Sequence, residues 1–244
     1  MKIWLPLLLL IIVSCSQKDV DNAQKIIDEA IETHGGKLYE DLKIGFQFRK
    51  YTYQISRLNG IFNYSRTYAD TTGTYQEALT NDGVTRSLNG SSVEMDQKTY
   101  DRVMESINSQ VYFALLPFGL NDAAVNKAYL GTKTVEGQPY HKIKVTFEEE
   151  GGGVDFEDVF IYWIHQDNHT VDYLAYEFHV NKGGFRFRKA YNVREVGGIL
   201  WADYINYKES DASTPLEDYD LLLEQGKLIE LSRIELEDVQ DLSK

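Results

Sequence analysis

The chain has 244 residues, of which 43% are hydrophobic and 13% aromatic, and its formal charge is −13. This acidity argues against nucleic-acid binding, which needs clustered lysines and arginines. Only four prolines occur and no low-complexity run divides the chain, so we expect a single domain over residues 15–244.

The N-terminus has the pattern of a signal peptide over residues 1–14. Lys2 precedes the apolar run Ile3–Val13, which is too short for a membrane span of ~20 residues and suits a signal-peptide core. The run ends in Ile12-Val13-Ser14-Cys15, which resembles the lipobox of bacterial lipoproteins, whose cysteine is acylated. Cys15 is the only cysteine and has no disulfide partner within the chain. We therefore expect lipidation at Cys15.

An acylated Cys15 would make the membrane a partner and place the protein in the cell envelope. The residue after it is Ser16 rather than Asp, which by the enterobacterial sorting pattern favours the outer membrane. Residues 15–21 would form a tether. The run Ser16–Asp21 also resembles the acidic export tag of surface lipoproteins of Bacteroidota, so the periplasmic and the surface face both remain open.

A helix is expected after the tether, capped by Asp19 or Asp21. Apolar residues recur at helical spacing over residues 23–31, and Gly35-Gly36 provides the left-handed end. His34 in the last turn is interpreted as favoured by the helix dipole.

From Lys43 onward the apolar period changes to two, with Ile44, Phe46 and Phe48 on one face. The turns at residues 58–60 and Asn81-Asp82-Gly83 predict an antiparallel meander of about four strands.

A helical insertion follows the meander. Asp96 caps a helix that runs into Val111–Leu120, the most apolar stretch after the N-terminus. Pro117 and Gly119 prevent that stretch from being one regular helix. Two interpretations remain open: the insertion fills the concave side of a sheet, or Phe113, Leu116 and Phe118 line a ligand cavity.

A second meander covers residues 155–207, preceded by a hairpin over residues 129–147 and followed by a short helix after Pro215 and a strand over residues 228–236. Residues 159–164 are apolar on both faces, which is typical of a central, covered strand. A four-residue hairpin at residues 181–184 predicts that Val180 pairs with Phe185. Glu177 then lies opposite Arg188, and Phe178 opposite Phe187.

This order of elements resembles the fold of the periplasmic lipoprotein carriers LolA and LolB. Several motifs also resemble an uncharacterised family of Bacteroidota lipoproteins: Thr33-His34-Gly35-Gly36, Tyr112-Phe113 through Asp122, Asp155 through Trp163, Gly184–Arg188 and Asp203-Tyr204. The resemblance implies an α+β fold, a strongly curved antiparallel sheet (an unclosed half-barrel) with helices plugging its concave face. It brings no active site.

No catalytic motif is present: GxSxG, SxxK, HExxH and CxxC are all missing. We therefore expect no catalytic residue and no cofactor. Asp155, Glu157 and Asp158 do not have the calcium-loop spacing, and no metal site is predicted. An envelope hydrolase is the least favoured class, and the enzyme question stays open with a lean towards no activity.

The favoured function is binding of a lipid or other hydrophobic ligand on the concave face; the alternative is a structural or interaction lipoprotein with a filled core. Eight residues are the candidate ligand contacts: Phe46, Phe48, Phe113, Leu116, Phe118, Trp163, Phe187 and Trp201. Arg186, Arg188 or Arg194 could meet an anionic head group. Pairing with acids such as Glu177 is the favoured alternative in so acidic a protein.

Overall fold

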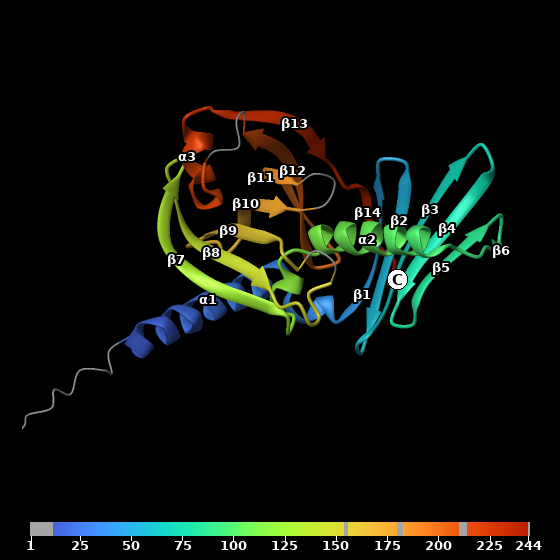
Figure 1. Ribbon diagram of the computed structural model, residues 1–244, viewed down its shortest axis with the longest axis horizontal. Helices are drawn as coiled ribbons and strands as arrows, with labels where there is room; N and C mark the ends of the chain where they lie inside the picture. The colour runs from blue at the N-terminus through green and yellow to red at the C-terminus, as the bar shows by residue number, and fades with distance from the viewer. Residues whose placement is uncertain (1–11, 154–155, 180–182, 210–213, 244) are drawn as a thin grey trace, which may run out of the picture.

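A computed structural model describes residues 12–153, 156–179, 183–209 and 214–243, with side chains from residue 22 onward. The strands form two antiparallel sheets of seven strands each that lie next to one another (Figure 1). Sheet A has the order β14-β1-β2-β3-β4-β5-β6. Its strands are β1 (Asp41–Phe48), β2 (Tyr51–Leu58), β3 (Ile61–Asp70), β4 (Gly73–Thr80), β5 (Gly83–Leu88), β6 (Ser91–Ser92) and β14 (Glu237–Asp241).

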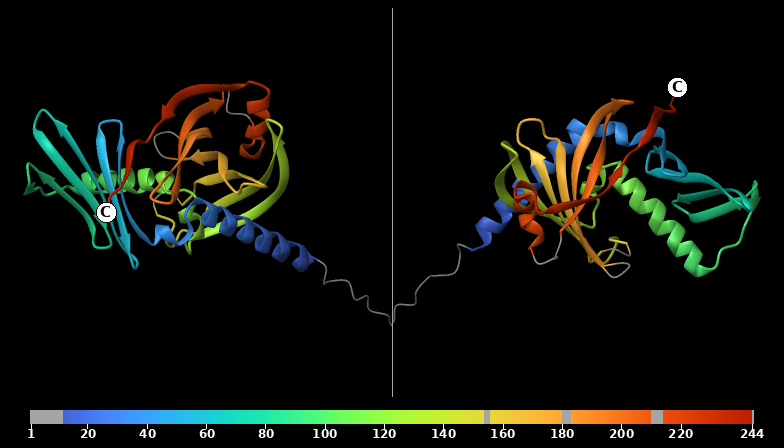
Figure 2. Two further views of the ribbon diagram at one scale, coloured as in Figure 1. Left: turned by 180° about the vertical axis from the view of Figure 1, so that it is seen from behind. Right: turned by 90° about the horizontal axis from the view of Figure 1, so that it is seen from above.

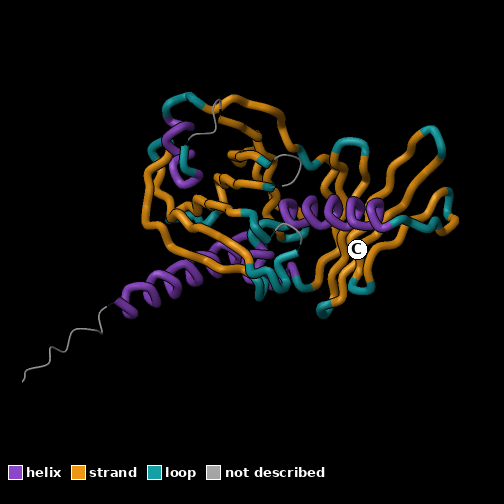
Figure 3. Tube along the Cα trace, in the orientation of Figure 1, coloured by secondary structure: helices purple, strands orange, loops and turns teal. Residues whose placement is uncertain are grey.

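Sheet B has the order β13-β12-β11-β10-β9-β8-β7. Its strands are β7 (Val125–Val135), β8 (Gln138–Phe147), β9 (Val159–His165), β10 (Val171–Phe178), β11 (Gly184–Val196), β12 (Ile199–Glu209) and β13 (Leu228–Ile234). Helices occupy the space beside the sheets (Figure 3): α1 (Ile12–His34), α2 (Gln97–Ala114) and α3 (Tyr219–Glu224), with the 3₁₀ turns η1 (Gly36–Tyr39), η2 (Phe118–Asn121) and η4 (Leu216–Asp218).

The α+β class is confirmed, but the expected single sheet is divided in two. Helix α1 begins at Ile12, before the predicted caps Asp19 and Asp21. Residues 1–11, most of the predicted signal peptide, lie outside the described residues, as do the side chains of residues 12–21, including Cys15. Within the part of the chain that the structure describes, no helix combines the length and apolarity needed to cross a membrane.

One face of sheet B, here called the inner face, is covered by α1 and by the segment after α2. Ala23, Ile27 and Ala30 of α1 are fully buried there. Leu116 and Leu120 join them against Ile143, Phe160, Tyr162, Leu174 and Tyr204. The apolar insertion therefore does fill much of this face with Leu116 and Leu120, whereas Leu115 is buried in the cluster of sheet A.

The opposite, outer face of sheet B is covered by η4 and α3. Leu216, Tyr219 and Leu222 pack against a cluster that includes Trp163 and Phe187. Asp220, which is 1% exposed, lies 3.5 Å from Lys142 Nζ and 3.6 Å from Lys133 Nζ. Both faces of the central strands are thus buried, as the two-sided apolarity of residues 159–164 predicts.

Helix α2 runs from sheet A to sheet B (Figures 1 and 2). Asp96 caps it by accepting the Thr99 N–H at 2.8 Å, as predicted. Val103, Ile107 and Val111 bury its apolar side in the cluster of sheet A.

A buried ion network lies beside the middle of α2. Glu77 is 2% exposed and contacts Arg66 Nε at 2.7 Å and Arg86 Nε at 3.2 Å. Arg66 Nη1 donates to Ser106 Oγ of α2 at 2.6 Å. The network therefore links the helix to strands β3, β4 and β5.

The β10–β11 register differs from the prediction. Glu177 is opposite Phe185, Tyr176 opposite Arg186, and Leu174 opposite Arg188. The predicted partner Val180 lies outside the described residues. A displacement by an odd number of residues exchanges the faces, so Arg188 shares the inner face with Leu174 instead of lying beside Glu177.

The chain passes from sheet B to sheet A between β13 and β14, and Asp203 of β12 fixes this crossing. Its Oδ1 accepts the Leu236 N–H at 2.9 Å, and its Oδ2 accepts from Asn192 at 2.6 Å. Arg194 pairs with the same carboxylate at 3.2 Å and also donates to the Leu236 carbonyl.

We predict that Glu77→Gln destabilises the fold by about 3–5 kcal/mol, because it leaves Arg66 and Arg86 without their buried counter-charge. Chemical denaturation measures the change. Glu94→Gln, at an exposed acid just before α2, is the control and should cost no more than about 0.5 kcal/mol. Equal effects of the two variants would contradict the role assigned to Glu77.

A second prediction concerns His34, which is 5% exposed and whose Nε2 accepts the Val171 N–H at 3.2 Å. Burial lowers the His34 pKa to about 4, so the neutral ring and not the dipole-favoured cation is the native form. The unfolded chain takes up this proton below about pH 6.5, and stability due to His34 should fall by roughly 2–3 kcal/mol between pH 6.5 and 4.

The variant His34→Gln supplies an acceptor for the Val171 N–H without titrating. The unfolding free energy of this variant, measured by denaturant titration at several pH values, should not show the fall between pH 6.5 and 4 that is assigned to His34. Parallel profiles for the two proteins would show that His34 is not held neutral.

Candidate functional site

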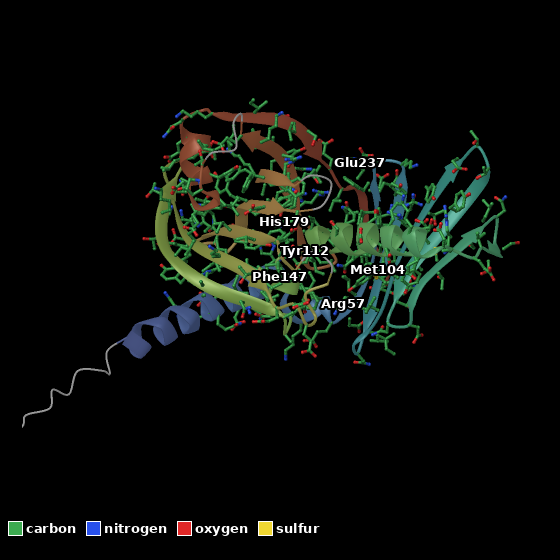
Figure 4. All side chains as sticks on the ribbon, viewed as in Figure 1. Arg57, Met104, Tyr112, Phe147, His179 and Glu237 are labelled. Atoms are coloured by element: carbon green, nitrogen blue, oxygen red, sulfur yellow. The ribbon has the colours of Figure 1, made fainter. Side chains whose placement is uncertain are left out.

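A cavity of about 460 Å³ lies where the end of α2 meets the inner face of sheet B. Strands β8 to β13 provide half of the lining residues and α2 provides much of the rest, while Phe48 at the end of β1 and the following Arg49 close one side. In Figure 4, the labelled Tyr112 and Phe147 lie toward sheet B, with Met104 further along α2 toward sheet A. The volume is within the ~300–1,000 Å³ range of small-molecule sites.

Aromatic rings form the apolar wall of this aromatic cavity. They are Phe48, Tyr112, Phe113, Phe147, Phe160, Tyr176 and Phe178. Their ring centroids are closely spaced: Phe113 lies 5.4 Å from Tyr176, and Tyr176 lies 5.2 Å from Phe160. Such a continuous aromatic surface offers contact to an apolar chain at little conformational cost.

The wall also carries arginines. Among the described residues, Arg49, Arg186 and Arg188 line the cavity together with one carboxylate, Asp158. The Arg188 guanidinium lies 3.8 Å from the Phe113 ring centroid, and its Nη2 donates to the Tyr176 hydroxyl at 2.8 Å. Arg186 lies 4.9 Å from the Phe178 ring and donates to the Phe185 carbonyl. Cations over rings are favourable contacts, more so when they are withdrawn from water.

Arg194, the third arginine considered from the sequence, has a different role. It pairs with Asp203 at the crossing between the sheets. The expected pairing with acids therefore holds for Arg194 and not, within the described part of the chain, for Arg186 or Arg188.

The Tyr112 side chain extends from the cavity to the buried Tyr162 of β9. Its hydroxyl is 2.9 Å from that of Tyr162. Burial raises the pKa of both phenols above the ordinary value, so both stay protonated and satisfy one another. They position the end of α2 and are not candidates for proton transfer near neutral pH.

His179 lies at the edge of the cavity, with Nδ1 3.3 Å from Asp158 Oδ1. Among the residues whose side chains are described, no serine is hydrogen-bonded to His179 and no group of three or more His, Cys, Asp or Glu residues could hold a metal ion. Asp155, one of the carboxylates weighed from the sequence, lies outside the described residues.

The structure brings two of the eight candidate ligand residues to the cavity, Phe48 and Phe113. Leu116 is buried in the inner-face cluster, and Phe46 and Trp201 are buried in the sheet A cluster. Phe118 stacks on Tyr39 at 4.9 Å. Trp163 and Phe187 lie on the outer face beneath α3.

Sequence reasoning did not single out Tyr112, Phe147, Phe160, Tyr176 and Phe178 as cavity residues. The strand period did contain a signal, since Tyr176 and Phe178 share one face of a strand. The sequence does not show which side of each strand belongs to the inner face of sheet B. On β9 the apolar residues occupy both faces, and the choice of Trp163 over Phe160 picked the outer one.

Comparison with solved structures supports a known fold. A LolA superfamily protein from Nitrosomonas europaea matches with a TM-score of 0.51 and 12% identity, over 91% of this chain and 94% of that one. A DUF1329 family protein from Desulfovibrio piger matches with a TM-score of 0.49 and 7% identity, over 91% and 93%. An outer membrane lipoprotein-sorting protein domain from Vibrio parahaemolyticus gives 0.44 and 11%, over 91% and 94%.

At these identities the first match shows a LolA-like fold and no more. No curated protein matches the sequence significantly. The model of a family of unknown function, DUF6503, matches residues 1–236, and the chain therefore belongs to this family.

Proposed function

We propose that the protein is a lipid-anchored envelope lipoprotein that binds an apolar chain, such as the acyl chain of a lipid, in the aromatic cavity. The observation that carries the proposal is the cavity itself, with about 460 Å³ of space and seven aromatic side chains in its wall. Water against the ring-lined part of this space gains few hydrogen bonds, so an apolar chain that displaces it there buries surface favourably.

The position of the cavity supports this proposal. The inner face of sheet B is filled by Ala23, Ile27, Leu116 and Leu120 on one side, and the filling stops at Tyr112 and Phe113. A plug that leaves one aromatic end unfilled departs from the close packing of ordinary protein interiors and is expected for a binding site.

The same filling favours the competing function, a structural or interaction lipoprotein. Most of the inner face is buried by packed apolar side chains, and the cavity is bordered by exposed residues such as Ser109. The two functions differ in one measurable respect, which is whether the protein carries a lipid when it is isolated from its own cells.

Native mass spectrometry of protein purified from its own envelope without lipid-like detergent should show a bound species of lipid mass. Ser109→Trp introduces an indole at the cavity rim and should reduce the bound fraction several-fold. Lys98→Trp, at an exposed position near the start of α2, is the matched control and should retain the ligand. Protein that is empty in every preparation would favour the structural function.

The anchor is a separate part of the proposal, supported by the Ile12-Val13-Ser14-Cys15 pattern. Each buried methylene of an attached acyl chain adds roughly 0.8 kcal/mol of membrane affinity. Cys15→Ala should therefore move the protein from the outer-membrane fraction to the soluble fraction and abolish incorporation of labelled fatty acid. Ser16→Ala keeps the cysteine and should remain membrane-bound; continued membrane association of Cys15→Ala would refute the anchor.

A further inference from the structure

Arg188 is a buried cation in the wall of the aromatic cavity. The residue is 8% exposed and comes from the middle of β11, on the inner face of sheet B. The rings of Phe113 and Tyr176 lie 3.8 Å and 5.1 Å from its guanidinium carbon. Because one of these rings belongs to α2 and the other to β10, the guanidinium is held between the two elements that enclose the cavity.

The hydrogen-bonding capacity of Arg188 is largely unused. A guanidinium has five N–H donors, and the Tyr176 hydroxyl is the only acceptor bonded to it among the described residues. Its Nε is buried without a partner, and no carboxylate of the described chain lies within 4.0 Å. Arg66, at a similar depth, has the carboxylate of Glu77 at 2.7 Å.

A buried cation without a counter-charge is costly, and ring contacts offset only part of that cost. A buried charge in a cleft that lacks a protein partner marks a candidate functional site. The surrounding charge points to the same conclusion, because the described lining residues include three arginines and one aspartate in a chain of formal charge −13. The Oδ1 atom of that aspartate, Asp158, lies 3.3 Å from His179 Nδ1.

We propose that the cavity is selective for amphiphiles with an oxyanion head group, a carboxylate or a phosphate, and that Arg188 is its principal donor with Arg186 beside it. This inference rests on the proposed uptake of an apolar chain by the same cavity. The planar guanidinium can offer two parallel N–H groups to an oxyanion, while the aromatic wall takes the chain. Neutral amphiphiles of equal length would gain the apolar contacts only.

The test compares four probes by isothermal titration calorimetry below their micelle concentrations: dodecanoate, dodecyl phosphate, dodecanol and inorganic phosphate. The protein is the full chain carrying Cys15→Ser, in buffer without detergent. We expect both anionic amphiphiles to bind at least ten times more tightly than dodecanol. Arg188→Gln should remove that preference and change the Kd of dodecanol by less than threefold.

Arg102→Gln is the matched control, because it removes the same charge from an exposed position on α2 outside the cavity lining. Arg102→Gln should still bind the anionic amphiphiles at least ten times more tightly than dodecanol. Arg188→Lys retains a charge but not the planar guanidinium, and should keep part of this preference for anionic amphiphiles. If Arg188→Gln does not fold, the carboxyl ¹³C signal of dodecanoate bound to the unaltered cavity gives the answer, since its pKa should lie below that of free dodecanoate.

Each other outcome contradicts a distinct step. Equal affinity for all three chain-bearing probes, or a preference that survives in Arg188→Gln, overturns the head-group inference and leaves chain binding intact. Binding of inorganic phosphate as tightly as dodecyl phosphate, dependent on Arg188, overturns selectivity for an amphiphile in favour of a free-anion site. Binding of none of the four probes overturns the proposed function, and the inference with it.

Discussion

The molecule depends on helix α2 being held at both ends by different sheets. In its first turn, the Tyr100 hydroxyl accepts the Val84 N–H at 3.3 Å. Near its middle, Ser106 accepts a hydrogen bond from Arg66, whose charge is balanced by Glu77. At its last turn, Tyr112 and Phe113 lie against the inner face of sheet B. A helix tied in this way cannot shift without breaking either the buried ion network or the aromatic cluster. The cavity between α2 and the sheet is therefore a fixed part of the architecture.

The aromatic cavity combines two environments that rarely coexist. Its rings provide a surface suited to hydrocarbon, and its arginines provide donors suited to an anion. The Arg188 guanidinium can lie in this apolar wall because it is placed over the Phe113 ring. The face of the ring is electron-rich, and its attraction for the cation replaces part of the lost hydration. The LolA-like fold supplies the frame, whereas the chemistry comes from side chains of β10, β11 and α2.

Much of this architecture could be predicted from local sequence. The caps, glycine turns and two-residue periods locate the helices and strands because each depends on a few neighbouring residues; Asp96 and Asn81-Asp82-Gly83 are examples. The burial of Leu116 and Leu120 follows from their apolarity, but not the choice of sheet B, because the neighbouring Leu115 is buried in the cluster of sheet A. The separation into two sheets could not be predicted in this way, because it depends on a crossing at Leu236 held by the distant residue Asp203.

The site was harder to predict for a related reason. Face assignment needs the strand register, and a hairpin with several glycines allows more than one register. The predicted register paired opposite charges, Glu177 with Arg188, which is normally good evidence. It was wrong because Arg188 is held by Phe113 and Tyr176 instead. Pairing of opposite charges predicts the wrong strand register when an arginine contacts aromatic rings and not an acid.

The crossing also decides how sheet A ends. Strand β14, formed by the last described residues, pairs with β1 and so becomes the outermost strand of that sheet. Glu237 and Asp238 are exposed on it, and its pairing is interrupted by a bulge between Gly45 and Gln47. Charged, irregular borders discourage the addition of foreign strands. If the C-terminal strand were removed, β1 would become the edge strand of sheet A. Its backbone N–H and C=O groups would then be unpaired, and other copies of the protein could add to this edge and aggregate.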